Sequence, residues 1–251
     1  MSDPILIERA GRVQIVRFNR IDKKNAIVRE MYATMAEAVS GADDDDDIGA
    51  TLFLGHPKVF TAGNDIKDFV SIATGQSEHS TEVVDFLRAI IGGKKPLVAG
   101  VDGIAIGVGV TMLMHCDLVY ASDRAMLQTP FVDLGVIPEA ASSMVGPQIM
   151  GHQRAFALLA MGEKFNAQQA YTAGLVNEVT TPGELEPRAL EMATKAAERA
   201  TEAMAISREL IRGDRQPVID RMEKEFSYFA ERLASDEARA AFMKFMNKAK
   251  V

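Results

Sequence analysis

The sequence predicts an α/β protein with a layered core and a helical C-terminal region. Short apolar segments of strand length alternate with amphipathic helical segments as far as about residue 180. This alternation is typical of sheets covered by helices. From Glu184 onward the chain is rich in alanine and charged residues, with apolar positions at helical spacing. We therefore expect a core over residues 1–183 that carries the active site and a helical region over residues 184–251.

The composition is that of an ordinary globular protein. Of 251 residues, 47% are hydrophobic and 25% are charged, so the chain can bury a large core without a metal or disulfide. A single cysteine, Cys116, excludes an intrachain disulfide. The net charge of −7 argues against a nucleic-acid or membrane-surface partner. No secretory leader and no bilayer-length apolar run is apparent, and we expect a cytoplasmic protein.

The N-terminal third predicts a hairpin, a loop, a helix and a strand. Alternating apolar residues over 5–9 and 13–18 flank a turn at Gly11. A polar loop over residues 19–26 precedes a helix that begins near Ile27. The five consecutive aspartates from Asp43 lack the spacing of a calcium loop and predict a solvated loop before a strand over residues 48–54.

Further elements follow from the same periodicities. Residues 71–80 are polar and show no helical or strand period. Helices and strands are expected before and after the glycine-rich stretch that begins at Gly103. The expected elements are a helix over 81–91, a strand over 97–101, helices over 145–161 and 167–173, a strand over 175–179, one or two helices over 184–212, and a helical tail over 218–250 broken near Ser235.

Two turns of small residues are candidate sites. They are Ala62-Gly63-Asn64 and Gly107-Val108-Gly109, each placed between a strand and a helix. Backbone N–H groups at a helix start lack intrahelical partners and carry positive partial charge. Two such turns that meet can bind one developing oxyanion. The alternative is that the glycines only let strand and helix pack closely.

Glu139 is the single acid between Leu134 and Val145, in an apolar neighbourhood. A carboxylate held there is expected to have a raised pKa, which suits a base that removes a proton from carbon. The alternative is a solvated loop residue after Pro138.

Other chemistries find little support. The glycine turn at 107–109 lacks the third glycine of a dinucleotide fingerprint, and no GxSxG segment is present. The four histidines form no zinc-binding pair. His115-Cys116-Asp117, at the end of an apolar helix, is expected to serve the core rather than form a triad. No metal or redox cofactor is expected.

These segments together resemble the enoyl-CoA hydratase/isomerase (crotonase) superfamily over the whole chain. NRIDKKNA (19–26) resembles its coenzyme-A loop, FTAGNDIKDF (60–69) its first oxyanion segment, and the stretch from Gly103 to Pro130 its second. The resemblance implies a ClpP-like crotonase fold with a ββα spiral core and C-terminal helices that assemble a homotrimer or a hexamer.

The resemblance also assigns the catalytic roles. The oxyanion hole falls on the backbone N–H groups of Asn64 and Val108. The two glutamates of the hydratases fall on Thr111 and Phe131, so both are absent. GVIPEAASS, with Glu139, is similar to the segment that carries the lone glutamate of Δ3,Δ2-enoyl-CoA isomerases. This implies an isomerase, with a hydratase or another acyl-CoA reaction as the alternative. A non-catalytic acyl-CoA-binding or RNA-binding homologue is a third reading, which the acidic charge disfavours.

Substrate contacts are implied by the same resemblance, with coenzyme A arriving as part of the substrate. The residues expected to contact it are Lys23, Lys24, Ala26, Ala62, Gly63, Asn64, Asp65, Ile66, Lys67, Gly107 and Phe131. Lys23, Lys24 and Lys67 are candidates for its phosphates. Phe242 and Lys244 are expected to reach the coenzyme of a neighbouring subunit, and the acyl pocket is expected from the 69–84 region with Phe131.

Overall fold

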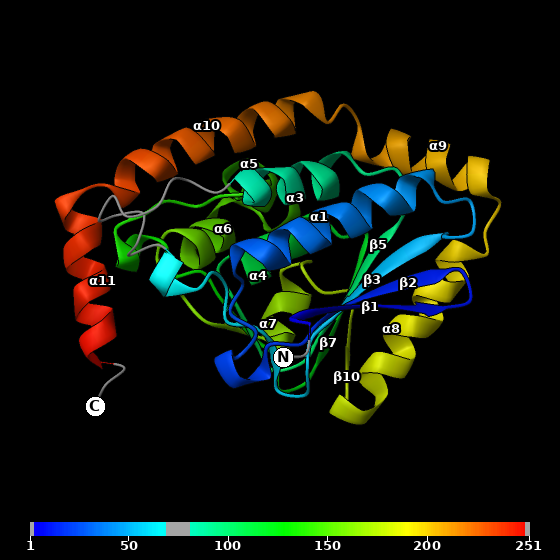
Figure 1. Ribbon diagram of the computed structural model, residues 1–251, viewed down its shortest axis with the longest axis horizontal. Helices are drawn as coiled ribbons and strands as arrows, with labels where there is room; N and C mark the ends of the chain where they lie inside the picture. The colour runs from blue at the N-terminus through cyan, green and yellow to red at the C-terminus, as the bar shows by residue number, and fades with distance from the viewer. Residues whose placement is uncertain (1–2, 69–80, 249–251) are drawn as a thin grey trace.

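The computed structural model describes residues 3–68 and 81–248. Within these ranges the chain forms two sheets enclosed by helices (Figure 1). The six-stranded sheet consists, in spatial order, of β1 (Ile5–Ala10), β2 (Val13–Phe18), β3 (Ala50–Leu54), β5 (Leu97–Val101), β7 (Leu118–Ser122) and β10 (Glu178–Thr180). The four-stranded sheet consists of β4 (Val59–Thr61), β6 (Ile104–Ile106), β8 (Met126–Gln128) and β9 (Phe165–Asn166).

The two sheets are built by one repeated step. The chain passes from β3 to β4, from β5 to β6 and from β7 to β8, each time leaving the large sheet for the small one. Strands β3, β5 and β7 are parallel, as are β4, β6 and β8, whereas the β1–β2 hairpin is antiparallel. This arrangement confirms the layered ββα spiral of the crotonase fold. It also brings the carboxyl ends of β4, β6 and β8 to one edge of the small sheet, where ligand sites of parallel sheets commonly form.

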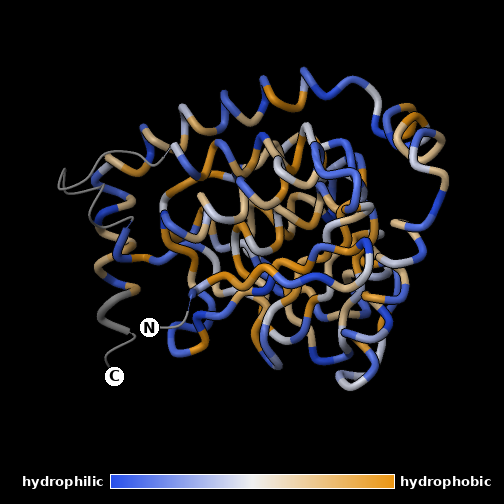
Figure 2. The backbone as a smooth tube through the Cα atoms, turned by 45° about the vertical axis from the view of Figure 1, so that its right-hand side comes forward, coloured by the Kyte–Doolittle hydropathy of each residue, from blue (hydrophilic) through white to orange (hydrophobic). Residues whose placement is uncertain are grey.

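Helices cover both faces of the large sheet. The helices up to residue 197 are α1 (Arg29–Asp44), α3 (Thr81–Gly92), α4 (Val108–Thr111), α5 (Ser142–Met150), α6 (His152–Leu159), α7 (Ala167–Thr172) and α8 (Pro182–Ala197), with short 3₁₀ helices η1 (Ile21–Lys23), η2 (Met112–His115) and η3 (Val132–Leu134). Apolar residues of α1 and α3 join the main core, which Figure 2 shows as the hydrophobic interior.

Helix α8 packs on the opposite face of the large sheet. Its buried residues Leu185 and Ala189 form a second apolar cluster with Ile15, Leu52 and Val98 of the strands. The predicted boundary between residues 183 and 184 lies inside α8. Because the apolar residues of α8 are buried against the large sheet, this helix packs as part of the core.

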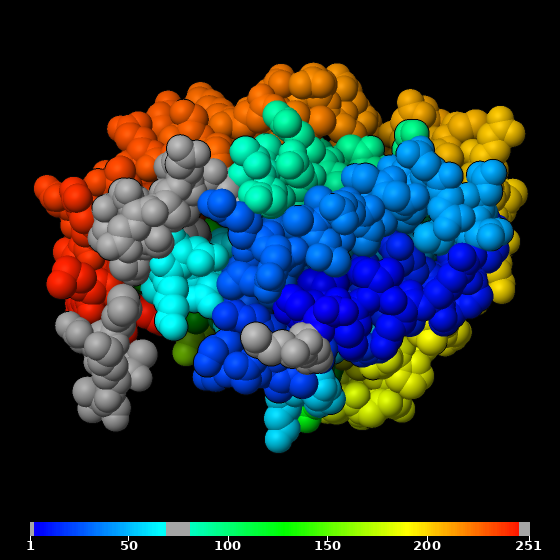
Figure 3. All heavy atoms as spheres, in the orientation of Figure 1, coloured from blue at the N-terminus to red at the C-terminus, as the bar shows by residue number. Residues whose placement is uncertain are grey.

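The last three helices wrap around the outside. They are α9 (Thr201–Arg212), α10 (Gln216–Leu233) and α11 (Asp236–Lys248), and they form one edge and one end of the face shown in Figure 3. Helix α10 lies along α3 and α5 (Figure 1) and buries Val218 and Met222. Phe242 of α11 is 1% exposed in the core of its own chain, so its ring is engaged there rather than free to meet a neighbour's coenzyme.

Two expected elements need correction, and four short strands were missed. The single helix expected over 145–161 is two helices, α5 and α6, because Gly151 between them has a left-handed φ of 76°. The strand expected over 175–179 forms at 178–180. Strands β4, β6, β8 and β9, with two or three residues each, were not predicted, since such segments are too short to show a two-residue period.

In the part of the chain that the structure describes, no helix has both the length and the apolar character needed to cross a membrane.

Candidate active site

The two small-residue turns meet at the shared edge of the small sheet. The first follows β4 and the second follows β6, which pair in parallel. A Cβ atom added to Gly63, where φ is 81°, would lie 2.7 Å from the carbonyl oxygen of Ile106. A Cβ atom added to Gly109 would lie 2.4 Å from Cγ2 of Thr61. The glycines therefore do permit close packing, and that packing brings the two turns into contact.

The backbone N–H groups of Asn64 and Val108 are available at this contact. Among the described residues, neither donates a hydrogen bond, whereas the neighbouring Gly63 N–H donates to Thr61 Oγ1 (3.0 Å) and Asp65 N–H to Ile27 O (2.9 Å). Val108 opens α4, where a backbone N–H has no intrahelical partner. Gly107 before it has φ 57° and ψ −120°, a conformation that favours glycine. Two free amides on touching turns are suited to bind one oxyanion.

Glu139 is buried beside the second turn. The residue is 9% exposed, and its Oε1 accepts a hydrogen bond from the hydroxyl of Thr111 in α4. Burial raises the pKa of Glu139 to about 7, with a further rise from the charge of Glu225, while the Thr111 hydrogen bond lowers it. The carboxyl group thus exchanges a proton near neutral pH, as a general base requires.

The loop after Glu139 has an unusual backbone. Ala140 and Ala141 are both left-handed, with φ of 60° and 55°, a conformation that is costly for alanine. The carbonyl of Ala140 pairs with Nε2 of His115 at 2.7 Å. Burial lowers the pKa of His115 to about 4, so the ring is neutral at pH 7. His115 thus has a structural role, as the sequence predicted, and it supports the loop that presents Glu139.

Tyr32 is a site residue that the sequence did not reveal. It lies on the buried face of α1, and its hydroxyl donates to Oδ1 of Asn64 at 2.5 Å. Burial raises the pKa of Tyr32 well above its usual value, and the charge of Glu139 raises it further. Tyr32 is therefore a neutral hydrogen-bond donor close to both Asn64 and Glu139. In the sequence, Tyr32 is only a tyrosine among the apolar positions of a predicted helix. Such a tyrosine is equally well explained by packing in the core, so the pattern does not indicate a site residue.

The loop over residues 20–26 lies against the first turn. Asn25, 0% exposed, donates through Nδ2 to the carbonyls of Val59 (3.1 Å) and Phe60 (3.0 Å) in β4. The carbonyl of Lys24 accepts the Ala62 N–H at 3.0 Å. Asn25 was missed by the sequence reasoning because nothing in the local pattern marks this asparagine as buried.

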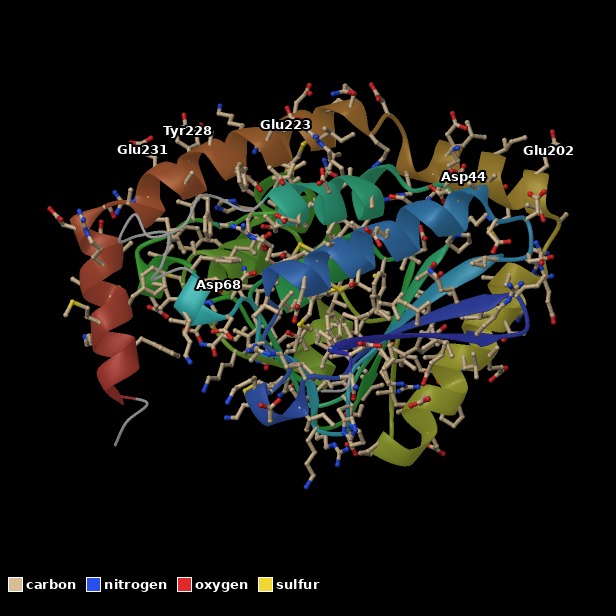
Figure 4. All side chains as sticks on the ribbon, viewed as in Figure 1. Asp44, Asp68, Glu202, Glu223, Tyr228 and Glu231 are labelled. Atoms are coloured by element: carbon tan, nitrogen blue, oxygen red, sulfur yellow. The ribbon has the colours of Figure 1, made fainter. Side chains whose placement is uncertain are left out.

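An ion pair joins the same loop to Asp65. Nη1 of Arg20 lies 2.8 Å from Oδ2 of Asp65 and also donates to the carbonyl of Ala26. Oδ1 of Asp65 accepts the N–H of Lys67 (3.1 Å) at the start of the helical residues 66–68, as expected of a helix cap. Asp65 thus holds the loop over residues 20–26 and its own turn together. Asp68, labelled in Figure 4, is the last of the helical residues 66–68.

The remaining predicted contacts are distributed as follows. Lys23, Lys24 and Lys67 are exposed, and Lys23 lies 3.6 Å from Asp22. Ile66 is partly buried against the main core. Phe131 follows β8 and is 6% exposed, with its ring edge 3.9 Å from a Cβ atom added to Gly107.

Some expectations fall elsewhere. Most of the predicted acyl pocket, residues 69–80, lies outside the described residues. In the described ranges no three histidine, cysteine or acidic side chains group as metal ligands. In the aspartate run, the Asp43 carboxylate accepts the backbone N–H groups of Lys94 and Lys95.

The chain is similar to several known proteins. The family model for enoyl-CoA hydratase/isomerase matches residues 8–251. Rat enoyl-CoA delta isomerase 2 is 36% identical over 98% of this chain, which spans 64% of the length of that relative. Mouse peroxisomal enoyl-CoA delta isomerase 3 is 35% identical over 98% of this chain and 78% of its own. A crystal structure of an enoyl-CoA hydratase/isomerase from Pseudoalteromonas atlantica is 38% identical, covers 98% of both chains and superimposes with a TM-score of 0.93.

Proposed function

Because the chain belongs to the enoyl-CoA hydratase/isomerase family, we propose that it moves the double bond of a 3-enoyl-CoA to the 2-position. The observation that carries this proposal is the partner of Glu139. Where a hydratase would place one of its two glutamates, Thr111 donates a hydrogen bond to Glu139 instead. The other hydratase position is the apolar Phe131. One buried base remains, which suits proton transfer between two carbons rather than the addition of water.

The reaction follows from the geometry of the two turns and the base. The thioester carbonyl accepts hydrogen bonds from the N–H groups of Asn64 and Val108. Glu139 removes a proton from C2, and the electron pair delocalises into the carbonyl to give a dienolate, whose negative oxygen the two amides stabilise. The protonated Glu139 returns the proton at C4, and the double bond then lies between C2 and C3. A pKa of about 7 suits both halves of this transfer, since the same group must accept and release one proton.

Coenzyme A enters as part of the substrate, and the loop over residues 20–26 is its proposed contact. Lys23 and Lys24 in this loop and Lys67 after the first turn are exposed cations. They offer positive charge to phosphates in a chain of net charge −7. Assembly into a homotrimer or hexamer, and a cytoplasmic location, remain part of this proposal.

A direct assay compares two substrates. Purified protein is incubated with a 3-enoyl-CoA, and the conjugated 2-enoyl thioester is followed by ultraviolet absorbance; a 2-enoyl-CoA is offered separately and its hydration is measured. We expect formation of the conjugated product and little hydration. Glu139→Gln is expected to abolish isomerisation while the variant still binds coenzyme A, and Glu163→Gln, at an exposed acid, serves as the control. Hydration without isomerisation would assign the chain to the hydratases, and RNA binding at physiological salt without turnover would favour the non-catalytic reading.

A further inference from the structure

Glu225 of α10 is a buried carboxylate that the proposed reaction does not use. It is 4% exposed and lies in the same buried stripe as Val218 and Met222. An ionisable group at such a position is costly unless hydrogen bonds compensate for its burial. The groups that bind Glu225 therefore indicate why an acid is present there.

Those groups belong to the first turn of α5. Oε1 of Glu225 accepts the backbone N–H of Ser143 at 3.1 Å and also the Ser143 hydroxyl. Nη1 of Arg221, one turn earlier on α10, donates to Ser143 Oγ at 3.1 Å. A carboxylate bound to the free N–H groups at a helix start stabilises that helix and the chain that leads into it. Here the chain that leads into α5 is the loop that carries Glu139.

That loop needs external support. Ala140 and Ala141 are two consecutive alanines in the left-handed region, which persists only where surrounding contacts enforce it. Within the loop, the Ser142 N–H donates to the Glu139 carbonyl at 3.1 Å across the two alanines. From outside, His115 pairs with the Ala140 carbonyl, and Glu225 accepts the N–H and hydroxyl of Ser143. Relaxation of either alanine would rotate the backbone next to Glu139 and move its carboxyl group away from Thr111.

Glu225 also acts on Glu139 through its charge. The charge of Glu225 is among the causes that raise the pKa of Glu139. Burial raises the pKa of Glu225 itself, while Ser143, Ala141 and Arg221 lower it. Its Oε2 is buried with no partner in the described part of the chain. His115 on η2 and Tyr32 on α1, also near this junction, are both neutral at pH 7. The cations whose charges act here are Arg221 on Glu225, and Arg212 and Arg215 on His115.

We infer that Glu225 is a positioning residue that holds residues 139–141 in the left-handed conformation that directs Glu139 at Thr111. The C-terminal helix α10 would thereby complete an active site whose base lies in the core. The effect on turnover rests on the proposed function, whereas the effect on the loop and on the titration of Glu139 does not.

The test compares Glu225→Gln and Glu225→Ala with Glu223→Gln. Glutamine keeps an oxygen that accepts the Ser143 N–H group but removes the charge, and alanine removes both. Glu223 lies on the outward side of the same helix (Figure 4) and pairs with Arg88 at the surface. Two readouts are needed: kcat and KM for the 3-enoyl-CoA, and the pKa of Glu139 from ¹³C NMR of labelled glutamate, with the Glu139→Gln spectrum identifying its signal.

We expect Glu225→Ala to lower kcat about 10-fold to 100-fold with KM little changed, as displacement of a catalytic group does. Glu225→Gln should recover most of kcat, and in both variants the pKa of Glu139 should fall towards the ordinary value. Glu223→Gln should match the wild type in both readouts. Wild-type kcat and an unchanged Glu139 titration in Glu225→Ala would overturn the inference. So would equal losses in both Glu225 variants with no change in the titration.

Two further outcomes remain decisive. If Glu225→Ala does not fold, as judged by circular dichroism, Glu225→Gln and Ser143→Ala carry the test, and wild-type titration of Glu139 in both would reject the role. If the wild type shows no isomerisation, the proposed function fails, but a Glu139 titration that shifts further in Glu225→Ala than in Glu225→Gln would still support the positioning role.

Discussion

The hydrogen bond from Thr111 to Glu139 makes a quantitative prediction about pH dependence. Thr111→Val replaces the hydroxyl by a methyl group of similar size at a position that is 0% exposed. The hydroxyl stabilises the ionised form of Glu139, so its removal should raise the pKa above the present value of about 7. A hydrogen bond to a charged group contributes about 1.5–3 kcal/mol, and one pKa unit corresponds to about 1.4 kcal/mol. The expected rise is therefore about 1–2 units.

The rise should appear in the pH profile of kcat/KM, which reports ionisation in the free enzyme. At pH 7 about half of Glu139 is ionised in the wild type, and a pKa about 1–2 units higher leaves about 1–10% ionised, so kcat/KM should fall about 5-fold to 50-fold. The loss should disappear at pH above the new pKa. Thr111→Ser, which keeps the hydroxyl, is the matched control. A profile that does not move, or a loss that persists at high pH, would refute the role assigned to this hydrogen bond.

Three other perturbations test separate parts of the site. The pKa of Glu139 in the folded protein lies above its ordinary 4.5, so the stability that its protonated carboxyl group contributes is present below pH 4.5 and is lost as the pH rises to about 7. Relative to Glu139→Gln, the free energy of unfolding of the wild type in urea should fall by on the order of 3 kcal/mol across this window. A constant difference between the two proteins would contradict the raised pKa. Tyr32→Phe leaves Asn64 Oδ1 without its donor, and kcat should fall about 3-fold to 10-fold with KM unchanged. A change in KM alone would argue against a role of the Tyr32 hydroxyl in positioning the first turn. Gly63→Ala places a methyl 2.7 Å from the carbonyl of Ile106 at a φ of 81°; thermal unfolding should show a loss of about 1–3 kcal/mol, and full stability would mean that the two turns can separate freely.

Much of the fold was accessible from local patterns. The hairpin at the N-terminus, the helix over 81–91 and the strand over 97–101 were predicted within one residue at each end, because each carries several repeats of its own period. The short strands of the small sheet carry one repeat or less. They form because parallel neighbours supply their hydrogen bonds, and those neighbours lie far away in the sequence.

For the site, the sequence by itself determined the chemical groups. It marked Glu139 as an acid in apolar surroundings and the two glycine turns as sources of free N–H groups, since both properties depend on adjacent residues. The absence of glutamate at Thr111 and Phe131 is likewise a fact of the sequence.

Only the tertiary structure decided how these groups act together. It brings the ends of β4 and β6 into contact, directs the Thr111 hydroxyl at Glu139, and adds Tyr32 and Glu225 to the site. Ser143 and Glu225 are 82 positions apart in the chain, and a hydrogen bond over that separation leaves no local periodicity. The surroundings that set the pKa of Glu139, and with it the proton transfer proposed here, therefore exist only once the C-terminal helices have packed on the core.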